Sequence, residues 1–292
     1  MKDLLRKAET LTEALPWIKE AWGRTVVIKY GGAAMTDPAL REMIASDLVL
    51  MKLVGINPVI VHGGGPDITS LMERLGMPVE FSQGLRVTDD DAMEVVKMVL
   101  VGKVNKEIVT AINRHGRFAV GIAGDDANLI KARPISAELG RVGEVESVDT
   151  TVVTDLIEDG FMPVVATVGY GEDGGSYNIN ADLVAGELAA ALDAAKVIFL
   201  TDVDGLYADL AHPDSLISAL TLAEAEAIIE ADRLSSGMIP KIAGCARALR
   251  GGVERAHILS GKVPHALLLE VYTDQGVGTM ITSAPGSGVS DG

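Results

Sequence analysis

The chain has 292 residues and a formal net charge of −16; 48% of its residues are hydrophobic and 23% are charged. This length allows a large core in one domain or in two lobes. The negative charge disfavours sequence-independent nucleic-acid binding, which needs a basic face, but a few local cations can still bind a small anion. The one cysteine, Cys245, excludes an internal disulfide framework and a multi-cysteine metal site. We expect Cys245 to be a small buried side chain on a helix, in a reducing compartment.

Residues 1–23 predict an amphipathic helix. Its apolar positions are spaced alternately by four and three residues and are Leu4, Ala8, Leu11, Leu15, Ile18 and Trp22. Pro16 removes a backbone donor and should kink the helix. We expect the apolar stripe to pack either on its own domain or on another subunit.

The sequence predicts neither an export signal nor a membrane segment. The N-terminal 23 residues include four acidic side chains and no continuous apolar stretch. A transmembrane helix would need about 18 consecutive apolar residues, and no such run occurs. We therefore expect a cytoplasmic protein without a membrane partner.

Two apolar strands run directly into glycines. Thr25–Tyr30 is followed by Gly31 and Gly32, and Asn57–His62 is followed by three more glycines. Glycine lets the main chain approach a phosphate, and Lys29 adds a mobile positive charge at the end of the first strand. These two junctions indicate a surface that binds a polyanion, as in a phosphoryl-transfer enzyme.

Helices and strands alternate through the rest of the chain. Helix starts are indicated by Asp37-Pro38, by a Thr88–Asp91 capping box, by Asn180 and by a Thr221–Glu224 capping box, and the first three helices should extend to about Val54, Arg114 and Leu192. Further strands are expected at Ala119–Ala123, Pro163–Val168, Lys196–Thr201 and His257–Leu259, with a β-hairpin excursion between about Ser136 and Val153. This alternation predicts an α/β three-layer sandwich with a mostly parallel central sheet. Ligands of such sheets bind beyond the carboxyl ends of the strands, where the glycines lie.

Two common phosphate motifs do not fit the sequence. Gly102-Lys103 is followed by Val104 in the middle of a predicted helix, so there is no Walker A motif. The Gly169-x-Gly171-x-x-Gly174 pattern follows a strand, but the next helix begins only after Asn180 and two carboxylates stand in between. We interpret residues 169–175 as a flexible loop and not as a dinucleotide site.

Three charged residues stand where a site is expected. Lys29 ends a strand, Asp182 lies in the first turn of the helix capped by Asn180, and Lys241 begins a later helix. The helix dipole favours the ionised form of Asp182. Each also has an ordinary structural interpretation: a lysine that extends to solvent, a carboxylate that stabilises a helix end, and a solvated lysine.

Six motifs together resemble the amino-acid kinase family, and within it the kinases of N-acetyl-L-glutamate. They are Ile28-Lys-Tyr-Gly-Gly32, Val61-His-Gly-Gly-Gly-Pro66, Gly84-Leu-Arg-Val-Thr88, Tyr177-Asn-Ile-Asn-Ala-Asp182, Leu200-Thr-Asp-Val-Asp-Gly205 and Gly237-Met-Ile-Pro-Lys241. The resemblance extends in order from about Thr25 to Ile281. Ser236 stands where the family usually has glycine and Ala33 where it often has asparagine.

The resemblance implies transfer of the γ-phosphoryl group of ATP to the side-chain carboxylate of N-acetyl-L-glutamate, with Mg²⁺ carried by the nucleotide and no metal site in the protein. Lys29 and Lys241 would bracket the phosphoryl group, and Asp182 would hold both ammonium groups. The remaining implied residues are Gly31, Gly32 and Gly64 for the phosphate, Gly64, Gly65, Arg86 and Asn178 for the acceptor, and Thr201, Asp204 and Gly205 for the nucleotide.

The resemblance also implies regulation. It assigns an inhibitory L-arginine site to Lys196, His257, Glu270 and Gly276, although Glu270 can also be a solvated glutamate. An N-terminal helix of this kind interlaces dimers into a hexamer, a trimer of dimers, and a nitrogen-signalling protein remains a candidate partner. The expected divisions are residues 1–23 for oligomerisation, 24–195 as the acceptor-binding and dimerisation lobe, 196–283 as the nucleotide and arginine lobe, and 284–292 as a disordered tail.

Two alternatives remain open from the sequence. One is another kinase of the same family, acting on aspartate, glutamate, carbamate or UMP. The other is a non-catalytic arginine sensor, which would be expected to lack one of the two lysines or to carry an added acetyltransferase domain. Lys29 and Lys241 are both present.

Overall fold

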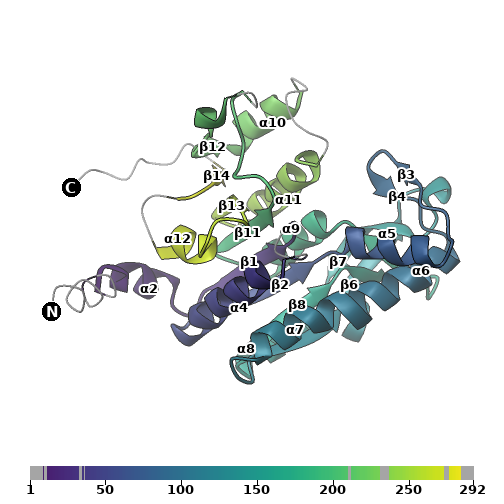
Figure 1. The fold of residues 1–292 in the computed structure, drawn as a ribbon, viewed down its shortest axis with the longest axis horizontal. Coiled ribbons are helices and arrows are strands. Elements are labelled where there is room, and N and C mark those ends of the chain that lie inside the picture. The colour runs from purple at the N-terminus through teal and green to yellow at the C-terminus, as the bar shows by residue number, and fades with distance from the viewer. Residues whose placement is uncertain are drawn as a thin grey trace.

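The computed structural model describes residues 9, 12–32, 35, 37–209, 212–230, 237–272 and 276–283 (Figure 1). Its main sheet has the strand order β12-β14-β13-β11-β1-β2-β8-β5 within the described residues. These strands are β1 (Thr25–Tyr30), β2 (Asn57–His62), β5 (Ala119–Ala123), β8 (Met162–Ala166), β11 (Lys196–Thr201), β12 (Ala219–Thr221), β13 (Arg255–Ser260) and β14 (Thr279–Thr282). Each neighbouring pair is parallel except β13 and β14. The predicted α/β fold with a mostly parallel sheet is confirmed.

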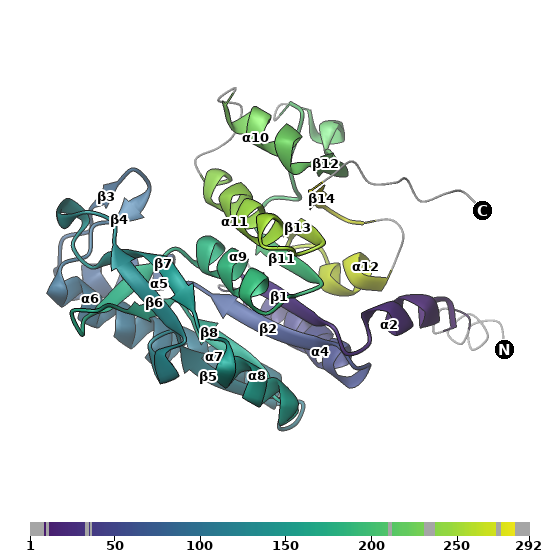
Figure 2. The same ribbon diagram turned by 180° about the vertical axis from the view of Figure 1, so that it is seen from behind.

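Helices cover both faces of this sheet (Figures 1 and 2). Alternate residues of β1 point to opposite sides: Val26 and Ile28 belong to one apolar core, and Val27 belongs to the other. The first core includes residues of α4 (Pro38–Leu53), α5 (Gly65–Arg74), α6 (Asp90–Lys97), α7 (Asn105–Asn113) and α12 (Ala266–Tyr272). The second includes residues of α8 (Thr151–Glu158), α9 (Ala181–Ala191), α10 (Leu222–Glu230) and α11 (Ile239–Arg250), among them the fully buried Cys245.

A smaller closed sheet of β6 (Ile130–Pro134), β7 (Val142–Val148), β9 (Val168–Tyr170) and β10 (Ser176–Ile179) lies beside one end of the main sheet (Figure 2). The predicted hairpin at residues 136–153 is therefore misplaced, because β6 begins at Ile130 and α8 already occupies residues 151–158. Residues 171–175 connect the antiparallel β9 and β10, as expected for a loop. A short hairpin of β3 (Phe81–Ser82) and β4 (Leu85–Arg86) stands nearby.

Three of the four predicted helix caps are present. The carboxylate of Asp37 accepts from Ala39 N at 2.8 Å, and the amide oxygen of Asn180 accepts from Asp182 N at 2.9 Å. Thr221 and Glu224 form the reciprocal capping box, with Thr221 N donating to Glu224 Oε2 at 2.7 Å and Glu224 N donating to Thr221 Oγ1 at 3.2 Å.

The Thr88–Asp91 capping box is wrong. Asp89 is the N-cap of α6, and its Oδ1 accepts from Ala92 N at 2.8 Å. The hydroxyl of Thr88 instead donates to the carbonyl of Arg86 at 2.8 Å. The long helix predicted to about Arg114 is interrupted by a π-helical segment, η1 (Met98–Val104), between α6 and α7.

At the N-terminal end the structure describes α2 (Leu15–Ala21), with Pro16 in its first turn and a turn at Ala14 before it. The expected helix positions Leu4, Ala8 and Leu11, and the tail 284–292, lie outside the described residues. In the described part of the chain, no helix has the length and apolar character needed to span a membrane.

Candidate active site

Lys29, Asp182 and Lys241 meet at one point. Lys29 Nζ lies 3.0 Å from Asp182 Oδ1, and Lys241 Nζ lies 3.3 Å from Asp182 Oδ2. Side-chain exposure is only 12%, 8% and 13% for Lys29, Asp182 and Lys241, so all three are shielded from bulk water. The carboxylate of Asp182 thus holds two ammonium groups near each other, although their like charges repel.

The fold builds this cluster from three elements. Lys29 is the penultimate residue of β1, Asp182 lies in the first turn of α9, and Lys241 lies in the first turn of α11. Two helix glycines let α9 and α11 approach closely. A Cβ at Gly244 would lie 2.4 Å from the carbonyl oxygen of Asp182, and a Cβ at Gly186 would lie 2.2 Å from the carbonyl oxygen of Gly244. Our sequence reasoning missed both glycines, although a glycine inside a helix is the signal for such close packing.

The glycines after β1 form a tight cradle beside Lys29. A Cβ at Gly31 would lie 2.5 Å from Lys29 Nζ, and one at Gly32 would lie 2.7 Å from Asp202 Oδ1. Gly32 also has φ +67°, a conformation that favours glycine. These positions leave no room for a side chain at the mouth of the cluster.

Arg86 is buried on β4, with 7% of its surface exposed. Its Nη2 donates to the carbonyl of Gly65 at 3.0 Å and to Thr69 Oγ1 at 2.6 Å, and its guanidinium lies 4.7 Å from the ring centroid of Phe81. Burial lowers the pKa of Arg86 from its ordinary value. Nη2 already has two oxygen acceptors, and Nη1 donates to Met72 Sδ, a weak acceptor, at 3.6 Å. Nε and the second hydrogen of Nη1 are therefore the donors that a ligand carboxylate could use.

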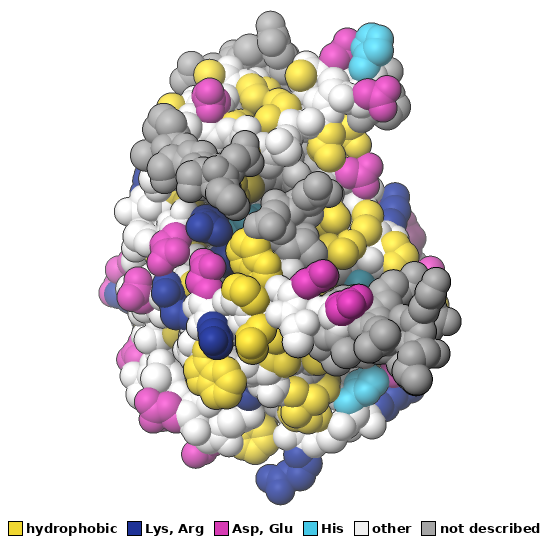
Figure 3. Space-filling view, turned by 90° about the vertical axis from the view of Figure 1, so that its left-hand side faces the viewer, with side chains coloured by type: hydrophobic (Ala, Val, Ile, Leu, Met, Phe, Trp, Pro, Cys, Tyr) yellow, Lys and Arg dark blue, Asp and Glu magenta, His cyan; other side chains and the backbone are white. Residues whose placement is uncertain are grey.

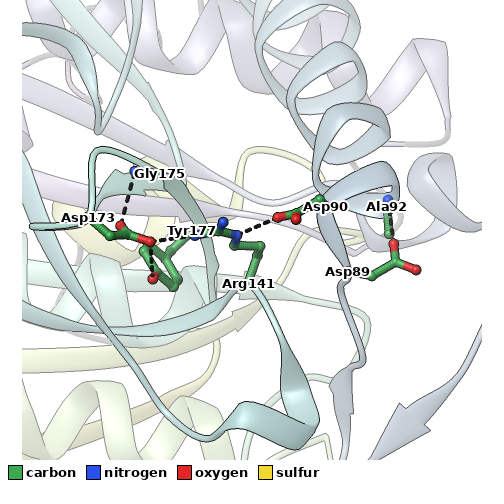
Figure 4. Close-up of polar contacts among 7 residues, drawn as sticks. All are labelled: Asp89, Asp90, Ala92, Arg141, Asp173, Gly175 and Tyr177. Atoms are coloured by element: carbon green, nitrogen blue, oxygen red, sulfur yellow. Dashed lines mark hydrogen bonds and ion pairs between the residues drawn. The ribbon is translucent and has the colours of Figure 1, made fainter.

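A salt-bridged clamp around Arg141 holds the neighbouring strands together (Figure 4). Arg141 Nε lies 2.6 Å from Asp90 Oδ1, and Nη1 lies 2.6 Å from Asp173 Oδ2. The backbone N–H of Arg141 donates to the carbonyl of Thr88 at 2.6 Å, and its carbonyl accepts from Asn178 N at 2.8 Å. Arg141 therefore links α6, the β9–β10 loop and the segments that carry Thr88 and Asn178.

The predicted phosphate and acceptor residues line a common cavity of about 280 Å³. Its wall includes Lys29, Gly31, Gly32, Gly63, Gly64, Gly65, Arg86, Asn178 and Asp182. Lys29 and Arg86 bring positive charge to this cavity although the whole chain is strongly negative. The cavity can therefore hold an anion with its negative groups at two separated points.

The three predicted nucleotide residues follow β11. Thr201 is its last residue and is buried. Asp204 Oδ2 accepts from the hydroxyl of Tyr207 at 2.9 Å, and a Cβ at Gly205 would lie 2.4 Å from Thr279 Oγ1. These residues lie beyond the carboxyl end of a strand that neighbours β1, where nucleotides bind in sheets of this kind.

The four residues predicted for arginine lie close together. His257 Nδ1 lies 2.5 Å from Glu270 Oε1, and a Cβ at Gly276 would lie 3.1 Å from both carboxylate oxygens of Glu270. Burial raises the pKa of Glu270, but the hydrogen bond and charge of His257, the N–H of Val277 and the charge of Lys196 together outweigh it, and the net pKa is lowered. Burial lowers the pKa of Lys196, which the negative charge of Glu270 opposes. Glu270 is buried, so its interpretation as a solvated glutamate is wrong.

The fold and these residues define a phosphotransferase of the amino-acid kinase type, and the comparisons agree. The family model described as "Amino acid kinase family" matches residues 24–260. The chain therefore belongs to the amino acid kinase family, which confirms the resemblance that the motifs indicated.

Two curated relatives narrow the assignment. Acetylglutamate kinase of Heliobacterium modesticaldum is 52% identical over 96% of this chain and 99% of its own length. Acetylglutamate kinase of Moorella thermoacetica is 52% identical over 95% of this chain and 97% of its own length. Among solved structures, N-acetylglutamate synthase from Neisseria gonorrhoeae, complexed with coenzyme A and N-acetyl-glutamate, has a TM-score of 0.83 and 26% identity. That alignment covers 96% of this chain, which spans 64% of the synthase chain.

Proposed function

We propose that this protein transfers the γ-phosphoryl group of ATP to the side-chain carboxylate of N-acetyl-L-glutamate, giving an acyl phosphate. Two acetylglutamate kinases, each 52% identical over nearly the whole chain, support this assignment. The observation that carries it in the structure is the pair of lysines on Asp182, of which Lys29 lines the same cavity as Asp182 and Arg86. This spacing of positive charge suits an acceptor with two carboxylates.

Both substrates are anions, so catalysis must come mainly from alignment and charge neutralisation. Lys29, at the end of β1 and beside Gly31, is assigned to the γ-phosphoryl side. Lys241, on α11, is assigned to the leaving ADP. Amide groups of Gly32 and Gly64 are assigned to the equatorial oxygens of the migrating group, as in an oxyanion hole. Nothing in this step requires a protein nucleophile.

Asp182 is assigned an organising role and not that of a general base. A carboxylate acceptor has no proton to lose in this reaction. Both oxygens of Asp182 already face ammonium groups, at 3.0 Å and 3.3 Å. Its charge keeps the two lysines close before the nucleotide arrives and offsets their mutual repulsion.

The donor site fits ATP. The side-chain-free positions Gly31 and Gly32 provide a close backbone approach for phosphates, and Thr201, Asp204 and Gly205 lie beyond the neighbouring strand β11. ATP supplies the phosphoryl group, and its Mg²⁺ would neutralise phosphate charge. We assign this Mg²⁺ to the nucleotide, because both oxygens of Asp182, the carboxylate of the cluster, already face lysines.

On the acceptor, Arg86 is assigned to the α-carboxylate, because a guanidinium carries a permanent positive charge and several N–H donors. Gly64, Gly65 and Asn178 are assigned to hydrogen bonds with the acceptor and its acetamido group. Asn178 lies on β10 with its side-chain amide 3.5 Å from Thr88 Oγ1. Arg86 and Asn178 thus come from the β3–β4 hairpin and the small sheet, whereas Gly64 and Gly65 follow β2 of the main sheet.

We also propose feedback inhibition by L-arginine at Lys196, His257, Glu270 and Gly276. The support is a buried carboxylate, Glu270, that can pair with a guanidinium. A small cavity beside Lys196 is also lined by Trp17 and Glu20 of α2. Because Lys196 lines this cavity, arginine bound at Lys196 would lie close to the N-terminal helix and could act on it.

A hexamer built as a trimer of dimers is the proposed assembly. The face that bears α2 exposes hydrophobic side chains between charged ones (Figure 3). The exposed large hydrophobic residues of α2, α4, α12 and their ends are Leu15, Trp22, Leu50, Leu53 and Leu269. Burying such residues against another subunit would be favourable. The proposal also includes a cytoplasmic location, lobes divided at about residue 195, and a nitrogen-signalling protein as a partner.

The test of the proposed function is an ATP-consumption assay with N-acetyl-L-glutamate, L-glutamate, L-aspartate, carbamate and UMP, each with and without L-arginine. We expect turnover with N-acetyl-L-glutamate, inhibition by arginine in the full chain, and loss of that inhibition in a variant without residues 1–23. A higher kcat/KM with any other acceptor would refute the assignment. Equal arginine inhibition of the truncated variant would exclude the N-terminal helix as the transmitting element.

A further inference from the structure

A buried histidine lies directly behind the second glycine segment. His62 is the last residue of β2 and is 0% exposed. Its Nδ1 lies 3.0 Å from the carbonyl oxygen of Gly63, and its Nε2 lies 3.1 Å from Nδ2 of Asn105. Burial lowers the pKa of His62 to about 4, so the ring is neutral at pH 7 and carries one hydrogen.

The partners of Asn105 determine where that hydrogen is. Asn105 Nδ2 donates to the carbonyl of Val164 at 2.8 Å and, at the longer distance of 3.3 Å, to that of Ile122, while Oδ1 accepts from Lys106 Nζ at 3.1 Å. These contacts fix which end of the amide faces His62. An amide nitrogen only donates, so Nε2 of His62 is the acceptor. The ring hydrogen is therefore on Nδ1, and His62 donates it to the carbonyl of Gly63.

The core makes room for this pair of polar side chains. Asn105 is also 0% exposed, and a Cβ at Gly121 would lie only 1.9 Å from its Oδ1. Asn105 is the first residue of α7 and directly follows the π-helical segment η1. Leu100 of that segment lies against Gly64, since a Cβ at Gly64 would be 2.7 Å from its Cδ2. Two polar groups buried this deeply are costly unless each is hydrogen-bonded, and here both are.

The hydrogen bond to Gly63 controls the next amide along the chain. The carbonyl of Gly63 and the N–H of Gly64 belong to one planar trans peptide and point in opposite directions. Fixing the carbonyl against His62 therefore directs the N–H of Gly64 away from the ring. Gly63 and Gly64 both line the cavity that contains Lys29 and Arg86.

We propose that His62 and Asn105 are positioning residues for phosphoryl transfer. Asn105 selects the Nδ1–H tautomer of His62, and His62 in turn holds the Gly63–Gly64 peptide so that the Gly64 N–H meets an oxygen of the migrating phosphoryl group. This inference rests on the proposed function, since it takes the Gly64 amide as a donor to that group. Neither His62 nor Asn105 touches substrate.

Kinetics of paired substitutions test the proposal. His62→Phe keeps a flat ring without a donor, whereas the amide nitrogen of His62→Asn can replace Nδ1. By analogy with loss of one oxyanion donor, we expect His62→Phe to lower kcat about 10²-fold with KM for both substrates changed less than about threefold, and His62→Asn to recover most of that loss. His212→Phe makes the same change on a side chain that is 74% exposed, and should leave kcat unchanged.

Near-normal kcat in folded His62→Phe, or equal loss in the Phe and Asn variants, would overturn the proposal. Nitrogen-15 NMR of histidine-labelled protein gives a second test, and the five histidines of the chain keep the spectrum simple. We expect His62 to be neutral with its hydrogen on Nδ1, and to lose that preference in Asn105→Ala. A hydrogen on Nε2 would contradict the inference. If the unmodified enzyme prefers another acceptor, the proposed function fails, and the same variants are then measured with that acceptor.

Discussion

Replacement of Gly244 by alanine tests whether the contact between α9 and α11 sets the distance between the two lysines. The new Cβ would lie 2.4 Å from the carbonyl oxygen of Asp182, whereas ordinary contact begins near 3.4 Å. The helices must therefore separate by about 1 Å at this point, the difference between these distances. Because backbone atoms meet on both sides, side-chain rotation cannot relieve the clash.

The separation should act directly on the cluster. Lys241 lies one turn before Gly244 on α11, and its Nζ is 3.3 Å from Asp182 Oδ2. A misplacement of about 1 Å can cost about 10²-fold in rate, so we expect kcat to fall by that order. KM for N-acetyl-L-glutamate should change little, because Arg86 lies on β4, away from both helices. Overpacking of this kind typically costs about 1–3 kcal/mol of stability.

Steady-state kinetics with each substrate varied in turn would measure both constants, and thermal unfolding would show that the variant is folded. Gly102→Ala is the matched control, since a Cβ there meets nothing within 4 Å. A folded Gly244→Ala enzyme with normal kcat would show that the helix spacing does not position Lys241. If Gly244→Ala instead raised the KM for the acceptor strongly, the substitution would be acting on the acceptor site and not on the lysines.

Further predictions follow from single side chains. Lys29→Ala should lower kcat about 10²-fold or more in steady-state assays, as for loss of an oxyanion-type donor. Arg86→Lys should raise acceptor KM more than it lowers kcat, because lysine lacks the planar fork. Arg141→Gln should likewise raise acceptor KM, with kcat largely retained, because it removes the ion pairs to Asp90 and Asp173 and so releases α6 and the β9–β10 loop beside Asn178. Burial lowers the pKa of His62 from 6.5 to about 4, so the unfolded chain binds the extra proton between these pH values and stability rises with pH across that window. At 1.36 kcal/mol per pKa unit, His62 should therefore add about 3 kcal/mol to the free energy of unfolding as the pH rises from 4 to 7. Denaturant titrations at these two pH values should show this increase in the unmodified enzyme and its absence in His62→Phe.

Local chemistry made the elements predictable. The bounds of β1 and β2 agree with the sequence expectation because each is an apolar run that ends at glycine. Asp37 and Asn180 cap their helices because an acceptor side chain stands just before a helical run. The Thr88 capping box failed for the same local reason, since the adjacent Asp89 offers a stronger acceptor to the same turn.

The site was less accessible to such reasoning. Nothing local to Lys29, Asp182 or Lys241 requires that they meet, and each alone has an ordinary structural explanation. Their convergence was expected from the family resemblance, whereas the physical cause is a backbone contact between Gly186 and Gly244 that only the packed structure contains. In the same way, a histidine at a strand end and an asparagine in a helix do not reveal that they share a hydrogen bond.

The division of the site between parts of the fold has a consequence for specificity. Lys29 and Asp182 stand on β1 and α9, which belong to the main sheet and the helix layer packed on it. Arg86 and Asn178 stand on the β3–β4 hairpin and the small closed sheet, outside the main sheet. Changes in cavity-facing side chains of these outlying strands can alter which anion is accepted without touching the α9–α11 contact, which backbone atoms of Asp182, Gly186 and Gly244 form. We therefore expect residues 81–88 and 168–179 to determine mainly which acceptor is used. Phosphoryl transfer should depend on Lys29, Asp182 and Lys241, whose elements include the two helices joined at Gly186 and Gly244.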